Sequence, residues 1–146
     1  MITHIEHIAI AVKNLEKSIK HYEDNFGLKC YKIEEVKNQK VRTAFFKLWE
    51  TKIELLEPTD SNGPVAKFIE KKGEGIHHIA FAVDNIKNTL KKMESGGIKL
   101  VDDKPRRGAE DLLIAFLHPK SNNGVLFELC ETKNQAGSQL EWEEKV

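Results

Sequence analysis

Two histidines and two glutamates occupy equivalent places in strand-like segments of this 146-residue sequence. His7 and His78 are each followed, at alternate positions, by two alanines, whereas Glu54 and Glu128 are each flanked by large apolar residues. Because side chains alternate between the faces of a strand, the alanines are expected to leave open space beside each histidine. Two imidazoles and two carboxylates suit a divalent ion such as Co²⁺, Ni²⁺, Mn²⁺ or Zn²⁺. Such an ion is a Lewis acid that can stabilise an enolate next to a carbonyl group.

An internal repeat carries these four residues. Residues 5–12 (IEHIAIAV) and 76–83 (IHHIAFAV) are identical at six of eight positions, at an offset of 71 residues. A lone histidine in a strand is more often a surface or core residue than a ligand, but four donors at duplicated positions favour a metal site. His77 is expected to face away from His78, and therefore not to be a ligand.

Apolar periodicity predicts the unit βαβββ, written twice. Helices are predicted between Asn14 and Gly27, at 64–72, and from Ile86 to the glycines at 96 and 97. The predicted strands lie at about 5–12, 29–36, 40–48, 51–57, 76–83, 98–102, 111–117 and 124–131.

The predicted fold class is therefore α+β, with a single domain at 1–131. Its two repeats cover about 3–58 and 74–131, and the short helix at 64–72 links them. The remainder, 132–146, is a polar tail with two isolated apolar residues, Leu140 and Trp142. We expect this tail to be frayed or loosely docked.

Composition excludes several classes of protein. Basic and acidic residues balance at 23 each, which disfavours nucleic acid as a partner. No apolar run approaches the roughly 20 residues of a membrane span, and no signal peptide is recognisable. The two cysteines, Cys30 and Cys130, are too few for a disulfide framework. We expect a soluble, cytoplasmic protein.

The chain resembles the methylmalonyl-CoA epimerases of the vicinal-oxygen-chelate superfamily over about residues 3–132. The segments that carry the resemblance are HIAIAVKNLEKSI, IELLEP and HPKSNNGVLFEL. The first is shared across the superfamily, including glyoxalase I, and the last is more specific to the epimerases. The resemblance implies two tandem βαβββ modules that form a cupped mixed sheet around a divalent metal ion. It also implies an isomerase that moves the α-proton of an acyl-CoA thioester through an enolate.

Carried over to this chain, the family's metal ligands would be His7, Glu54, His78 and Glu128. Glu128 matches the glutamate that serves one face of the substrate. A second acidic residue of some epimerases aligns near Thr43, and threonine cannot act as a base at neutral pH. The resemblance to glyoxalase I therefore makes Glu54 the candidate for the second proton relay.

Two features of the sequence bear on the substrate. The loop before the HPK segment is glycine-rich in many epimerases, whereas Glu110 and Asp111 stand there in this chain and are expected to alter the fit of the acyl group. Basic side chains are expected near the phosphates of CoA. The candidates are Lys104, Arg106, Arg107 and Lys120.

Two alternatives remain open from the sequence. One is a glyoxalase I-like lactoylglutathione lyase, which would use the same metal and proton shuttle on a different thiol substrate. The other is a non-catalytic small-molecule-binding protein of the same fold, against which the four ligand candidates argue. In all three cases modules of this type frequently associate as homodimers.

Overall fold

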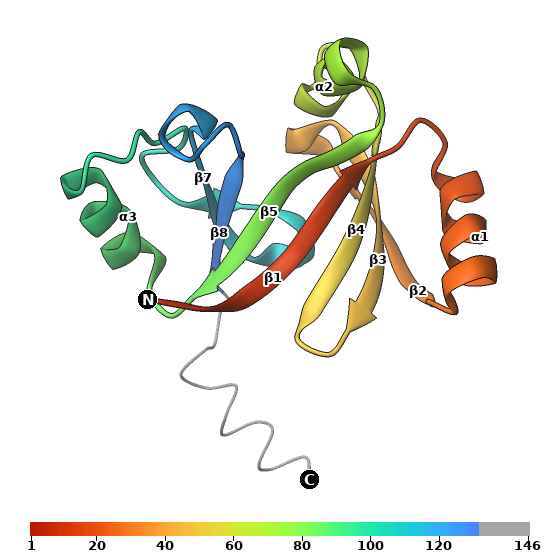
Figure 1. The fold of residues 1–146 in the computed structure, drawn as a ribbon, viewed down its shortest axis with the longest axis horizontal. Coiled ribbons are helices and arrows are strands. Elements are labelled where there is room, and N and C mark those ends of the chain that lie inside the picture. The colour runs from red at the N-terminus through yellow and green to blue at the C-terminus, as the bar shows by residue number, and fades with distance from the viewer. Residues whose placement is uncertain (132–146) are drawn as a thin grey trace, which may run out of the picture.

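The computed structural model describes residues 1–131 (Figure 1), so the predicted tail with Leu140 and Trp142 lies outside the described residues. The strands are β1 Ile2–Ala11, β2 Cys30–Val36, β3 Val41–Leu48, β4 Thr51–Pro58, β5 Gly75–Val83, β6 Arg106–Arg107, β7 Leu113–Leu117 and β8 Phe127–Glu131. The α-helices are α1 Leu15–Phe26, α2 Pro64–Lys72 and α3 Ile86–Ser95. Short 3-10 turns lie at Lys37–Gln39, Ala109–Asp111 and Pro119–Ser121.

All eight strands form one mixed sheet, in the order β2-β3-β4-β1-β5-β8-β7-β6. The two repeats meet where β1 pairs antiparallel with β5. Within each repeat the first strand pairs parallel with the last, β1 with β4 and β5 with β8. The sheet is strongly curved, and α1 and α3 lie on its two flanks (Figure 1). The predicted α+β fold of two βαβββ modules is thus confirmed.

The helices begin and end at residues suited to those places. Asn14 and Asn85 each accept a hydrogen bond from a backbone amide three residues on, at 3.0 Å, as N-cap residues do. α1 ends at Gly27, whose φ of 66° lies in the left-handed region that glycine enters freely. No helix within residues 1–131 is long and apolar enough to cross a membrane.

Open space was predicted beside each histidine, and a cavity does adjoin His78, but the neighbouring alanines are buried and do not line it. Ala9 and Ala11 are fully buried, in one apolar cluster with Val65 of α2. Phe68 and Ile69 of α2 also pack against this cluster. The small side chains therefore admit a helix close to the sheet, and the open space lies further along, as described below.

One predicted strand is wrong. At 98–102 the structure has only an isolated bridge between Leu100 and Leu117. The amides of Val101 and Asp102 both donate to the Phe116 carbonyl, and the Asp102 carboxylate accepts the Phe116 amide at 2.9 Å. Because a side chain takes the place of a strand partner here, the chain leaves the sheet and returns only as the two-residue strand β6.

Candidate metal and catalytic site

Three of the four predicted donors converge where β1, β5 and β8 meet. The Nε2 atoms of His7 and His78 are 3.1 Å apart. An oxygen of Glu128 lies 2.9 Å from Nε2 of His78 and 3.8 Å from Nε2 of His7. All three side chains are buried, and their donor atoms lie within 4.8 Å of one another.

The fourth donor, Glu54, joins the cluster from a different side. In the pairing of β1 with β4, Glu54 stands opposite Ala9, two residues after His7. Its carboxylate lies 2.8 Å from Nδ1 of His7, the ring nitrogen that does not face His78. The structure thus brings Glu54 into contact with His7, but its carboxylate is not among the donor atoms of His7, His78 and Glu128 that lie within 4.8 Å of one another.

The charges in this cluster depend on one another. Burial alone would raise the pKa of Glu128, but the charge of His7 and the hydrogen bond to His78 outweigh it, and the pKa falls to about 2. Burial would lower the pKa of His7, yet the carboxylates of Glu54 and Glu128 raise it well above the usual value. Glu128 is therefore ionised at neutral pH and stays an acceptor.

The donor set fits a divalent metal ion. Among residues 1–131 the buried carboxylates are those of Glu6, Glu54 and Glu128. Buried carboxylates are costly unless they are paired or coordinate a cation. Lys52 pairs with one of them, since its Nζ lies 2.9 Å from Glu6. Two imidazoles with carboxylate oxygens suit borderline first-row ions, so the residues present fit such an ion.

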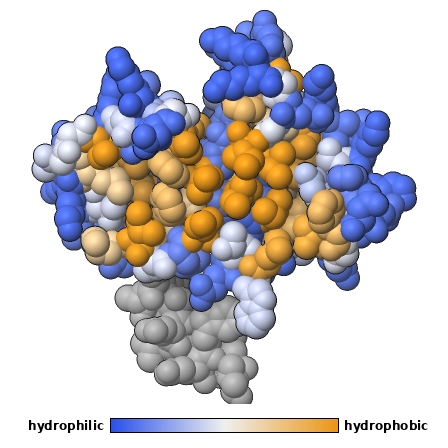
Figure 2. Space-filling model, viewed as in Figure 1, coloured by the Kyte–Doolittle hydropathy of each residue, from blue (hydrophilic) through white to orange (hydrophobic). Residues whose placement is uncertain are grey.

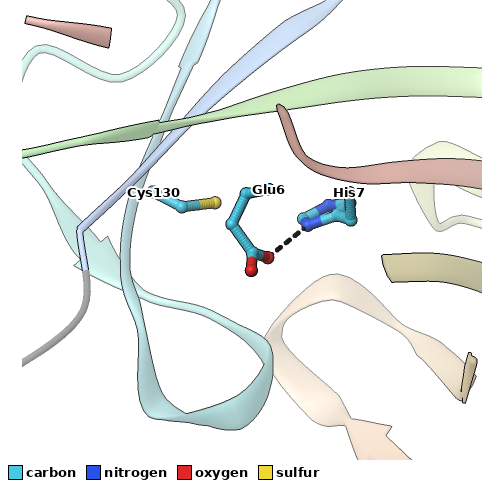
Figure 3. A group of neighbouring side chains, drawn as sticks. All are labelled: Glu6, His7 and Cys130. Atoms are coloured by element: carbon cyan, nitrogen blue, oxygen red, sulfur yellow. Dashed lines mark hydrogen bonds and ion pairs between the residues drawn. The ribbon is translucent and has the colours of Figure 1, made fainter. Parts of the chain in front are cut away.

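A second group of donors, Glu6, His7 and Cys130, is less suited to a metal (Figure 3). Burial, together with the charge of Glu128, raises the pKa of Cys130 well above its usual value. Its thiol donates a hydrogen bond of 3.0 Å to Glu128. Because a thiolate is the form that binds metals, Cys130 serves better as a hydrogen-bond donor to Glu128 than as a ligand.

A cavity of about 170 Å³ adjoins His78. Its walls are mainly apolar, with a few polar groups, which is typical of a small-molecule site. The lining residues are Asn38, Gln39, Leu56, Pro64, Val65, His77, His78, Val101, Arg106, Phe116 and Leu126. A candidate metal ligand therefore faces a pocket that both halves of the chain build.

Comparison with known proteins agrees with this geometry. Residues 6–116 match the family described as the Glyoxalase/Bleomycin resistance protein/Dioxygenase superfamily. The ethylmalonyl-CoA/methylmalonyl-CoA epimerase of Cereibacter sphaeroides is 36% identical over 131 residues, which cover 88% of this chain and 98% of that protein. The mitochondrial methylmalonyl-CoA epimerase of Dictyostelium discoideum is 39% identical over 128 residues, which cover 87% of this chain and 77% of that protein. The chain belongs to the methylmalonyl-CoA epimerase family.

Structural similarity supports the same assignment. A structure of a Streptomyces coelicolor methylmalonyl-CoA epimerase variant, in complex with 2-nitronate-propionyl-CoA, superposes with a TM-score of 0.88 at 34% sequence identity. The match covers 92% of this chain and 97% of that one. The resemblance to the epimerase family noted from the sequence is therefore confirmed.

Of the four basic residues predicted to bind the substrate of an epimerase, the structure places one at the cavity. Arg106 lines it, with its guanidinium carbon 5.6 Å from the centre of the Phe116 ring and its Nε 3.2 Å from Asp102. Lys104, Arg107 and Lys120 are exposed and do not line this cavity.

The loop that departs from the epimerase pattern is fixed against the other half of the chain. The Glu110 amide donates to the Glu34 carboxylate at 3.0 Å. The Glu110 carboxylate lies 2.7 Å from Nζ of Lys52 and accepts a hydrogen bond of 3.2 Å from the Tyr31 hydroxyl. Thr43, the other departure from the family, is buried on β3 opposite Leu56.

Two further residues lie near the site: Glu6, which the sequence did not single out, and His77, which was expected to face away from His78. The pairing between β1 and β5 shifts register at each of them, so each is the extra residue of a β-bulge. Nδ1 of His77 lies 2.8 Å from Nδ1 of His78, instead of pointing away as predicted. Burial and the neighbouring His78 lower the pKa of His77 to about 4, so His77 is neutral at pH 7. The only signal in the sequence was a polar residue at the same repeat position in two apolar strands.

Proposed function

We propose that this chain is a metal-dependent epimerase that interconverts the two epimers of methylmalonyl-CoA. The observation that carries the proposal is the convergence of His7, His78 and Glu128 beside an apolar cavity. Two relatives that cover 87% and 88% of the chain are named for this activity, and one of them is also named for ethylmalonyl-CoA.

Epimerisation requires that a proton leave one face of the α-carbon and that another arrive on the opposite face. Glu128 is ionised and buried, and we assign to it the removal of the proton on one face. The Cys130 thiol and His78 hydrogen-bond to Glu128 and hold it in orientation. We assign the opposite face to Glu54, the other buried carboxylate beside His7 that the resemblance implies.

A divalent ion held by His7, Glu54, His78 and Glu128 would supply a Lewis acid that draws negative charge from the α-carbon to the thioester oxygen. Co²⁺, Ni²⁺, Mn²⁺ and Zn²⁺ remain the candidates, because all four suit mixed nitrogen and oxygen ligands. Burial of the four side chains keeps bulk water from competing for the transferred proton.

The cavity is suited to a small branched acyl group. Leu56, Val65 and Leu126 offer apolar walls, and Arg106 offers a cation for a carboxylate or a phosphate. We propose that Lys104, Arg107 and Lys120 meet the phosphates of CoA at the surface, where all three are exposed.

A homodimer is part of the proposal. Figure 2 shows apolar side chains gathered over the middle of the sheet, between α1 and α3. β1 and β5, which run through the middle of the sheet, carry exposed or half-buried isoleucines, namely Ile5, Ile8, Ile76 and Ile79. A patch of this kind marks an interaction site more often than free surface. Sedimentation equilibrium on the full chain tests this, and a monomer at micromolar concentration would reject it. A cytoplasmic location stays a prediction, with which two free cysteines agree.

The activity is tested by following α-proton exchange of methylmalonyl-CoA in D₂O by NMR, with metal-loaded protein. We expect rapid exchange that a chelator abolishes. A parallel assay with methylglyoxal and glutathione serves as the control for a glyoxalase I-like reaction. Turnover in that assay without α-proton exchange would reject the epimerase. No reaction in either assay would reject both the epimerase and the glyoxalase I-like enzyme.

A further inference from the structure

Each half of the sheet has a β-bulge directly before its candidate metal-binding histidine. Register between β1 and β5 shifts at Glu6 and again at His77, and these two positions are related by the 71-residue repeat. Glu6 precedes His7, and His77 precedes His78. β-Bulges re-aim side chains and are enriched next to active sites. The repeated bulge therefore brings one extra polar side chain to each histidine.

Glu6, the bulge residue of the first half, contacts Nδ1 of His7, the ring nitrogen that does not face His78. An oxygen of Glu6 lies 2.8 Å from Nδ1 of His7 (Figure 3), and both side chains are buried. An ionised carboxylate only accepts hydrogen bonds, so Nδ1 is the donor. Nε2 is the nitrogen that faces His78 and Glu128. A metal ion bound at Nε2 would take the place of the hydrogen there, and the ring would keep its remaining hydrogen on Nδ1.

Glu54 approaches the same nitrogen of His7, also at 2.8 Å. Nδ1 carries one hydrogen, so the two carboxylates compete for it. Glu54 is assigned above to the metal and to proton transfer. Glu6 is then the carboxylate left to accept the hydrogen.

Glu6 is itself fixed from the far side. Nζ of Lys52 lies 2.9 Å from Glu6 and 2.7 Å from Glu110, and the Lys52 side chain is largely buried. Glu110 belongs to the second half of the chain, where Tyr31 of the first half donates to it. A continuous row of charged contacts therefore runs from Glu110 through Lys52 and Glu6 to His7.

We propose that Glu6 is a positioning residue that aims Nε2 of His7 at the metal site by accepting its Nδ1 hydrogen, with Lys52 holding the Glu6 carboxylate in place. This inference rests on the proposed function, because it concerns the same metal site. The two halves differ in the group that contacts Nδ1 of the histidine. For His7 it is the Glu6 carboxylate, and for His78 it is the imidazole of His77.

Metal affinity and the visible spectrum of the Co²⁺-loaded protein test the proposal. The variants are Glu6→Ala, Glu6→Gln and Lys52→Met, with Glu50→Gln as the matched control, because Glu50 is exposed in the turn between β3 and β4. Affinity is measured by competition with a chromophoric chelator. Carboxylates that orient metal-binding histidines typically contribute about 10- to 100-fold in affinity, and we expect this loss in Glu6→Ala.

The conservative variants sharpen the test. Glu6→Gln keeps an oxygen that accepts the Nδ1 hydrogen, so it should recover part of the affinity lost in Glu6→Ala. Lys52→Met should weaken Co²⁺ binding in the same direction by a smaller factor, since Glu6 remains. A changed Co²⁺ spectrum in the Glu6 variants would report altered ligand geometry, which simple loss of stability does not produce.

Unchanged Co²⁺ affinity and spectrum in both Glu6 variants would overturn the proposal, as would an equal loss in Glu50→Gln. If Glu6→Ala fails to fold, Glu6→Met decides instead, because it keeps much of the side-chain volume and offers no oxygen to the Nδ1 hydrogen. An unchanged affinity and spectrum in Glu6→Met would overturn the proposal. The unaltered protein is assayed for α-proton exchange in the same preparation. If the unaltered protein shows no exchange but the Glu6 variants bind Co²⁺ more weakly, the epimerase is rejected and the positioning role stands. If the unaltered protein shows exchange but the Glu6 variants bind Co²⁺ normally, the positioning role is rejected and the epimerase stands.

Discussion

The two halves of the chain share a scaffold and differ at its edges. In each half a glutamate at the end of the last strand accepts the first amide of that half's helix. Glu57 accepts from Leu15 at 2.7 Å, and Glu131 accepts from Ile86 at 3.0 Å. The outermost strands are unlike, because β2 has 7 residues whereas β6 has 2. The two repeats therefore share the glutamate that joins helix to sheet, and they differ in the strands at the two edges of the sheet.

The short outer strand has a consequence for the site. Residues 108–111 are not used in strand pairing, and they reach the first half of the chain instead. There Lys52 binds Glu110, and the Asn38 side chain donates to the Arg107 carbonyl at 3.1 Å. This loop of the second half thus packs against the first half. The cavity beside the proposed metal site is also lined unequally by the two halves, since Asn38 comes from the first half and Arg106 from the second.

The largest expected effect comes from replacing either of the two candidate metal-binding histidines, one of which lies in each half. His7→Ala and His78→Ala should each abolish stoichiometric metal binding, because the two Nε2 atoms converge on one point. Metal content after dialysis, measured by mass spectrometry, checks this. His21→Ala is the matched control, since His21 is exposed on α1. Full occupancy in either site variant would show that the two halves do not share one ion.

The next effect separates the two carboxylates. Glu128→Gln should retain most of the metal and lose at least about 100-fold in turnover, the scale of a lost general base. Glu54→Gln tests the equivalent place in the first half, and equal roles predict a comparable loss. Steady-state rates of epimerisation in both directions provide the measurement. A much smaller loss in Glu54→Gln would leave the proton chemistry to the second half, and near-normal turnover of Glu128→Gln would place the base elsewhere.

The sequence predicted the features that occur in both repeats, and it did not predict the contacts that form between the two repeats. The duplicated strand, the helices after Asn14 and Asn85, and the four clustered donors all follow from local patterns. Glu6 and His77 did not follow, because strict alternation assumes unbroken register. The bulges arise from pairing between strands about 70 residues apart, which no local pattern encodes. The ion pair of Glu110 with Lys52 likewise joins residues that are 58 positions apart in sequence.

The smallest effect tests whether the halves are equal as structural units. Asn14→Ala and Asn85→Ala each remove an N-cap with the same 3.0 Å geometry. Each should lower the free energy of unfolding by about 1 kcal/mol, as measured by urea denaturation. The caps lie on opposite flanks of the sheet (Figure 1), so the double variant should lose the sum of the two within about 0.5 kcal/mol.

The two cap variants are expected to lose similar unfolding free energy because the two halves share one sheet. β1 and β5 are paired along most of their length, so neither half can unfold while its neighbour keeps a complete sheet. A single cooperative transition is therefore expected in the unaltered chain and in all three cap variants. Two separate transitions would mean that one half folds independently. The metal site, which takes donors from both halves, would then form only after the second half had docked.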